Sequence, residues 1–72
     1  MSHYHFRVVP DDHGWNAQRG SRILAHYSDM DDAINRARVE AALHQPSEVI
    51  VHLRDGDRVT DSTFGWTDPD LH

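Results

Sequence analysis

A single helical stretch lies between segments in which apolar and polar residues alternate, and this arrangement limits the fold to a sheet with one helix. The helix should begin after Asp29, because aspartate side chains accept hydrogen bonds from the free N–H groups of a first turn and complement the helix dipole. It should run from Met30 to His44 and end before Pro46. At about 100° per residue, small and apolar side chains form one stripe: Met30, Ala33, Ile34, Ala37 and Ala41. The alanines allow this helix to lie close against a sheet.

Five segments alternate with the period of β-strands, and turn residues separate them. The predicted strands are residues 3–9, 15–19, 22–27, 48–54 and 58–64. Residues 10–14, Gly20-Ser21 and Asp55-Gly56 supply the turns, and Asp55-Gly56 is the strongest hairpin signal. We therefore predict an α+β fold, in which an antiparallel β-sheet of order βββαββ carries a single helix on one face. We expect residues 3–65 to form one domain and residues 66–72 to form a tail that frays.

The alternation also predicts which side chains face the helix. Those expected on the helix side are Tyr4, Phe6, Val8, Trp15, Ala17, Ile23, Ala25, Tyr27, Val49, Val51 and Leu53. Because one helix covers one face, the opposite side of the sheet must face water or a partner. The side chains expected there are mostly polar: His3, His5, Arg7, Val9, Asn16, Gln18, Arg22, Leu24, His26, Ile50, His52 and Arg54.

Four groups of residues occur in an order and spacing typical of one family. They are Val8-Val9-Pro10, Gly14-Trp15-Asn16-Ala17, the helix residues Asp29 to Ala33 with Ala37 and Ala41, and Val51-His52-Leu53-Arg54-Asp55-Gly56. Together they resemble the small bacterial family called domain of unknown function 2188, over about residues 4 to 65. The chain departs from the family's usual pattern in having no lysine and a shorter charged stretch around Arg19-Gly20. The resemblance supports the α+β fold and implies no activity.

Composition excludes several classes of protein. The 72 residues include 12 acidic and 7 basic side chains, and the net charge of −5 argues against a chain that coats DNA or an anionic membrane. No stretch approaches the ~18 apolar residues that a membrane span needs, and the N-terminus lacks the regions of a signal peptide. The absence of cysteine excludes disulfides and thiol chemistry. We expect a cytoplasmic protein with no membrane contact and no cofactor.

The sequence contains no known catalytic motif. It has no G-x-S-x-G elbow, no P-loop, no H-E-x-x-H and no dinucleotide fingerprint. The paired acids Asp11-Asp12 and Asp31-Asp32 already have turn or capping roles. A chain this small also has little room for an enclosed pocket beside its core. We therefore expect no enzymatic activity and no catalytic residues.

The sheet face away from the helix suggests two functions, although an ordinary solvated face would show the same alternation. Its basic side chains could bind nucleic acid: Arg7, Arg22, His26, His52 and Arg54. The acidic net charge and the predicted burial of the aromatic rings argue against nucleic acid as a partner. Alternatively, His3 and His5 point the same way from one strand, and His26 or His52 could complete a histidine metal site or a pH sensor.

Val39 and Leu43 lie one turn apart on the helix side opposite the alanine stripe. In a monomer these apolar side chains would be exposed, unless the tail containing Trp66 and Leu71 covers them. We therefore predict an interaction patch at Val39 and Leu43, for an unidentified protein partner or for a second copy in a homodimer. The function that the sequence favours is a small binding module that acts through protein–protein association, using either the Val39/Leu43 side of the helix or the Arg/His face of the sheet.

Overall fold

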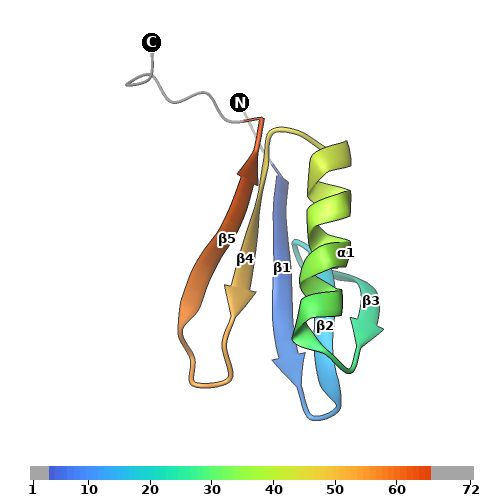
Figure 1. The fold of residues 1–72 in the computed structure, drawn as a ribbon, viewed down its shortest axis with the longest axis vertical. Helices are drawn as coiled ribbons and strands as arrows, with labels where there is room; N and C mark the ends of the chain where they lie inside the picture. Colours follow the sequence, from blue (N-terminus) through green and yellow to red (C-terminus); the bar gives the residue numbers. More distant parts are fainter. Residues whose placement is uncertain (1–3, 66–72) are drawn as a thin grey trace.

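The computed structural model describes residues 4–65, which form five strands and one helix in the predicted order βββαββ (Figure 1). The elements are β1 (Tyr4–Asp11), β2 (Gly14–Arg19), β3 (Arg22–Tyr27), α1 (Met30–Leu43), β4 (Ser47–His52) and β5 (Arg58–Phe64). The chain is therefore α+β, and the predicted bounds of β3 and β5 are confirmed. Within residues 4–65, no helix has the length and apolar character needed to cross a lipid bilayer. We predicted that residues 66–72 fray, and these residues lie outside the described range.

All the strands belong to one sheet, with the spatial order β3-β2-β1-β4-β5. β1 pairs parallel with β4, whereas the other neighbouring strands are antiparallel. The prediction of a purely antiparallel sheet is therefore wrong, and the sheet is mixed. The cause is α1, which returns the chain along the sheet after β3 (Figure 1). As a result, β4 runs in the same direction as β3 and β1, and it joins the edge of β1 that β2 leaves free.

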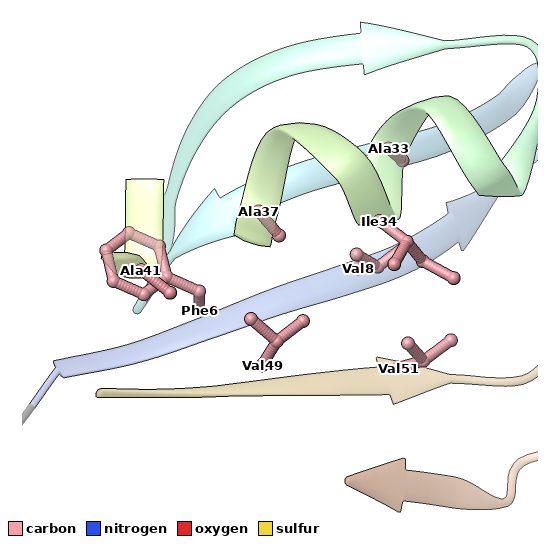
Figure 2. Close-up of a cluster of buried hydrophobic side chains, with 8 residues drawn as sticks. All are labelled: Phe6, Val8, Ala33, Ile34, Ala37, Ala41, Val49 and Val51. Carbon is pink, nitrogen blue, oxygen red and sulfur yellow. The ribbon is translucent and has the colours of Figure 1, made fainter. Parts of the chain in front are cut away.

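The core lies between α1 and the central strands of the sheet. One cluster of its buried apolar residues comes from β1, β4 and α1 (Figure 2): Phe6, Val8, Ala33, Ile34, Ala37, Ala41, Val49 and Val51. Ala17 of β2 is also fully buried. The register explains why the strand residues meet, because Phe6 lies opposite Val49 and Val8 lies opposite Val51. The predicted helix stripe is thus confirmed as the buried side of α1.

Hydrogen bonds to helix carbonyls fix the return from α1 into β4. Ser47 begins β4, is fully buried, and donates its hydroxyl to the carbonyl oxygen of Ala41 at 2.6 Å. The side-chain amide of Gln45 donates to the carbonyl of Ala42 at 3.0 Å, so two carbonyls of the last turn gain partners. At the other end of α1, Asp29 occupies the predicted N-cap position, but its side chain makes no capping hydrogen bond.

A β-bulge between β2 and β3 changes which side chains of β3 face the helix. The register shifts after Ala17, which pairs with Ala25, so that Gln18 pairs with Ile23. Because a bulge adds one residue, the alternation beyond it is reversed. Leu24 packs against the core, whereas Ile23 is 57% exposed. The orientations expected for Ile23 and Leu24 are therefore exchanged.

Candidate functional site

α1 covers one side of the sheet, and we call the opposite side the open face. Among residues 4–65, no helix or strand packs over it. The strand registers assign to it His5, Arg7, Val9, Asp11, Asn16, Gln18, Ile23, His26, Glu48, Ile50, His52, Arg58, Thr60 and Thr63. On the central strands, Val9 and Ile50 are half-buried. The open face therefore has apolar side chains near its centre, and polar and charged groups around them.

Three basic side chains lie where β1, β4 and β5 adjoin on the open face, and we call Arg7, His52 and Arg58 the basic cluster. Arg58 pairs directly with His52, and Arg7 pairs with Ile50, which precedes His52 by two positions on β4. Burial of the His52 ring lowers its pKa, and the charges of Arg7 and Arg58 lower the pKa further. His52 is therefore neutral at pH 7, and its Nε2 is buried with no hydrogen-bond partner among the described residues.

The arginines of the basic cluster differ from those of the helix. Within the part of the chain that the structure describes, Arg7 and Arg58 make no side-chain hydrogen bond and no ion pair. In contrast, Arg36 and Arg38 of α1 are each paired with a carboxylate, at 3.2 and 2.7 Å. The cluster thus carries positive charge that the described chain does not neutralise.

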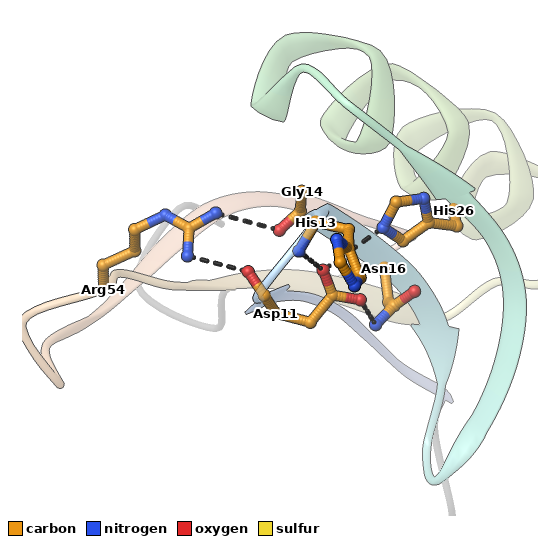
Figure 3. A network of polar contacts seen from close by, with 6 residues as sticks. All are labelled: Asp11, His13, Gly14, Asn16, His26 and Arg54. Atoms are coloured by element: carbon orange, nitrogen blue, oxygen red, sulfur yellow. Dashed lines mark hydrogen bonds and ion pairs between the residues drawn. The ribbon is translucent and has the colours of Figure 1, made fainter.

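Asp11 organises the end of the open face beside the β1–β2 turn (Figure 3). Its carboxylate accepts hydrogen bonds from the backbone N–H of His13 at 2.8 Å and from the side-chain amide of Asn16 at 2.9 Å. Nε2 of His26 lies 3.2 Å from the same carboxylate. The bond from His13 is the main cause of the lowered pKa of Asp11, and the contacts with His26 and Asn16 lower the pKa further. Both carboxylate oxygens are therefore engaged in holding the turn and β3.

Arg54 lies at this end of the sheet and not on the open face, where it was expected. Its Nη1 donates to the carbonyl oxygen of Asp11 at 2.8 Å, and its Nη2 donates to that of Gly14 at 3.1 Å (Figure 3). The guanidinium also lies 5.0 Å from the ring centre of Trp15, within the range of a cation–π contact. Arg54 therefore links the segment after β4 to the β1–β2 turn.

The bulge in β3 also moves Arg22 away from the open face. Arg22 pairs with Arg19, whose guanidinium lies 4.5 Å from the centre of the Tyr4 ring on the helix side. The basic residues predicted for the open face are therefore divided. The structure keeps three of them there: Arg7, His26 and His52.

Of the histidines considered as metal ligands, the described ones (His5, His26 and His52) lie in separate parts of the open face. His5 pairs with Glu48 at 2.7 Å, whereas His26 pairs with Asp11. His5 and Asp11 lie near opposite ends of β1. In an extended strand, six residues correspond to a separation of roughly 20 Å. His52 belongs to the basic cluster, whose charges disfavour a bound cation. Within residues 4–65, no three side chains of His, Cys, Asp or Glu are placed to hold a metal ion, and the candidate ligand His3 lies outside the described residues.

The predicted interaction patch on α1 is exposed. Val39 and Leu43 have 58% and 71% of their surface accessible. They lie on the side of α1 that faces away from the sheet, because the buried stripe occupies the opposite side. The sequence suggested that Trp66 and Leu71 could cover this patch, and both residues lie outside the described range.

Comparison with known families decides how this chain is classified. The family model described as an uncharacterized protein conserved in bacteria, DUF2188, matches residues 6–63. The chain belongs to the DUF2188 family. The resemblance inferred from the sequence is therefore confirmed, and the segment matched to DUF2188 begins in β1 and ends in β5, so it contains α1 and most of the open face. No curated protein and no solved structure matches the chain significantly.

Sequence reasoning overlooked part of the open face of this DUF2188 protein. Alternation placed Val9 and Ile50 on the correct side, but neither was considered as part of a binding surface. Arg58 was overlooked because its strand alternates poorly. The hairpin signal Asp55-Gly56 predicts that this strand pairs with the preceding one, but symmetric pairing about that two-residue turn would place Arg58 opposite Leu53. The structure pairs Arg58 with His52 instead, so the turn signal alone does not place Arg58 on the open face.

Proposed function

We propose that this DUF2188 protein is a small cytoplasmic binding module without catalytic activity, which associates with another protein through its open face. The observation that supports the proposal is the composition of that face. Val9 and Ile50 lie on its central strands with polar or charged neighbours, and Ile23 adds an apolar side chain that is 57% exposed on the edge strand β3. Protein interfaces commonly combine an apolar centre with a polar rim in this way.

The contacts around Asp11 argue against a role in acid–base catalysis. A general acid or base works best when its pKa lies near the operating pH and when its site excludes water. The pKa of Asp11 is lowered by the hydrogen bond from His13, Asp11 is only half-buried, and His26 is exposed. This histidine–carboxylate pair therefore fits a structural role at the end of the sheet.

A second candidate function is self-association through the interaction patch on α1. The exposure of Val39 and Leu43, at 58% and 71%, favours it, because two copies of α1 in contact would remove both side chains from water. Such a homodimer would leave the open face free. The two candidates therefore predict different effects of the same substitutions.

Affinity capture from nuclease-treated extract of the native host distinguishes them when three baits are compared. The baits are the unmodified chain, an open-face variant with Ile23→Ser and Ile50→Ser, and a helix variant with Val39→Ser and Leu43→Ser. We expect one protein to be recovered in near-stoichiometric amount with the unmodified chain and the helix variant, and to be lost with the open-face variant. Circular dichroism and thermal unfolding verify that both variants are folded.

Two other results would contradict the proposal. Recovery of each bait without any other protein would argue against a stable protein partner. Loss of the partner from the helix variant alone would place the binding site on α1. Light scattering of the same three proteins tests the homodimer, because a dimer formed through α1 should dissociate in the helix variant and persist in the open-face variant.

A further inference from the structure

We infer that the partner of the open face presents an acidic segment, and that Arg7 and Arg58 bind its carboxylates on the two sides of His52. This inference rests on the proposed function and adds the chemistry of the partner. Three features of the basic cluster support it: the distribution of acids around it, the spacing of its side chains and the apolar residues beside it.

Two acids of the open face, Glu48 and Asp11, are engaged by side chains outside the cluster. The chain carries 12 acidic side chains, yet Arg7 and Arg58 have no carboxylate partner within residues 4–65. Glu48 is 2.7 Å from His5, and Asp11 is held at the end of the sheet by side chains of β2 and β3. The cluster is therefore a local positive region on a chain with a net charge of −5, and such a region attracts a negatively charged partner.

The spacing places both arginines within reach of one bound segment. Arg58 on β5 and Arg7 on β1 flank β4, on which His52 lies. Directly opposite side chains have Cβ atoms about 5 Å apart, and diagonal neighbours about 7–8 Å. These are the distances from His52 to each arginine, and the charges of Arg7 and Arg58 contribute to the lowered pKa that keeps the imidazole uncharged at pH 7. Carboxylates of one bound segment would therefore meet two cations, one on each side of a neutral ring.

Apolar residues lie within the same surface. Ile50 is the direct neighbour of Arg7 across the β1–β4 pairing and of Thr60 across the β4–β5 pairing. A segment with apolar side chains between its acids could therefore contact Ile50 while its carboxylates accept hydrogen bonds from the arginines. Guanidinium groups suit this role, because their planar fork can bind a carboxylate through two parallel hydrogen bonds.

Nucleic acid would also present anions to the arginines, but two observations disfavour it. The net charge of −5 repels a polyanion. Proteins that bind single strands stack the bases on exposed aromatic rings, and the aromatic rings of residues 4–65 lie on the helix side. These rings belong to Tyr4, Phe6, Trp15, Tyr27 and Phe64.

The test uses the purified full chain and a short capped peptide of alternating glutamate and valine, titrated at low salt and followed by NMR. A matched peptide has glutamine in place of every glutamate. We expect the glutamate peptide to shift the resonances of Arg7, Ile50, His52 and Arg58, and to bind at least about tenfold more tightly than the glutamine peptide. The variant Arg7→Gln/Arg58→Gln should lose about tenfold or more in affinity. Arg22→Gln, which removes an exposed arginine from the helix side, should bind like the unmodified chain.

Equal affinity for the two peptides, no binding of either, or unchanged affinity in Arg7→Gln/Arg58→Gln would overturn the inference. Tighter binding of single-stranded oligothymidylate than of the glutamate peptide would also overturn it and assign the cluster to nucleic acid. Affinity capture separates this failure from that of the proposed function. If Ile23→Ser/Ile50→Ser loses the partner and Arg7→Gln/Arg58→Gln retains it, the open face binds a protein, but the carboxylates of that protein do not contribute to binding. If neither variant affects capture, the proposed function fails as well.

Discussion

The two sides of the sheet differ in chemistry although the same strands form both. On the helix side of β1 and β4, Phe6 and Val49 are fully buried, whereas the next residues along each strand, Arg7 and Ile50, belong to the open face. Because side chains alternate along a strand, a step of one residue changes a core position into a surface position. The interactions that stabilise the fold and the groups proposed to bind a partner are therefore on opposite sides, and substitutions should alter one without the other.

The largest effect is expected from a substitution in the core. Phe6→Ala removes a fully buried ring and should lower the free energy of unfolding by about 3–5 kcal/mol. Ile50→Ala on the open face should cost only about 1 kcal/mol, because Ile50 is half-buried. Urea denaturation followed by circular dichroism measures both losses. Similar losses for the two variants would show that the open face is packed like a core, which would break the division between the two sides.

The next largest effect is expected at Gly14, where the β1–β2 turn approaches β3. Its φ is +147°, and an added Cβ would lie 2.3 Å from the carbonyl oxygen of Tyr27. Gly14→Ala should therefore cost about 2 kcal/mol or more, because the steric clash adds to the backbone strain. Gly20→Ala is the matched control, since Gly20 has a φ of +60° and no atom within 4 Å of the added Cβ; its cost should be about 1 kcal/mol. Equal losses in urea denaturation would show that the contact with β3 is not what requires glycine at position 14.

The basic cluster predicts a pH dependence that arises on the open face. The pKa of His52 is lowered in the folded chain, so the unfolded chain binds more protons between that pKa and the ordinary histidine value of about 6.5. The stability contributed by the neutral imidazole is therefore complete above about pH 6.5 and is lost as the pH falls toward the lowered pKa. Arg7→Gln removes one charge that lowers the pKa of His52 and should raise that pKa, as measured by NMR titration of the imidazole. Arg22→Gln should leave the pKa unchanged, and an equal rise in both variants would mean that proximity to His52 does not matter.

The smallest effect is expected from the ion pair between α1 and β5 on the helix side. Arg38 donates two hydrogen bonds to the carboxylate of Asp61, at 2.7 and 2.8 Å. The hydrogen bond from Arg38 lowers the pKa of Asp61 below 3.8, so the stability from this pair is present above that value and is lost as the pH falls through the lowered pKa. Asp61→Asn should reduce the acid sensitivity of thermal unfolding and cost little at neutral pH, because the guanidinium of Arg38 is exposed and ion pairs at a surface contribute little. If Asp61→Asn melts with the same pH dependence as the unmodified chain, the pair has no role in acid stability.

Local patterns predicted the elements of this fold, but not all of their pairing. The periodicity of Ala33, Ala37 and Ala41 identifies the buried side of α1 because every residue of the stripe belongs to one helix. Asp55-Gly56 likewise predicts a hairpin between segments that are adjacent in sequence. The parallel pairing of β1 with β4 joins segments on either side of three other elements. No local pattern records the order of strands in a sheet, so this pairing could not be predicted.

The candidate site shows the same limit at the level of single side chains. Alternation placed Arg7 and His52 correctly, because the strands that carry them are regular where those residues lie. It misplaced Arg22, since the bulge that reverses β3 depends on the partner strand as well as on β3 itself. It misplaced Arg54 because β4 ends at His52. Beyond that point the backbone leaves the sheet, and the guanidinium can reach the carbonyl oxygens of the β1–β2 turn.

The parallel junction of β1 and β4 has a consequence for how a partner would recognise this protein. It joins two locally paired parts of the chain, the three-stranded meander β1–β3 and the hairpin β4–β5. Arg7 belongs to the first part, and His52 and Arg58 belong to the second, so the basic cluster exists only after the two parts have docked. A ligand that bridges the junction binds the native state alone, and it should raise the melting temperature in proportion to the logarithm of its concentration above the dissociation constant. The melting temperature should therefore report how much of the protein has ligand bound at the junction. The ligand would recognise only copies of the chain that have completed folding.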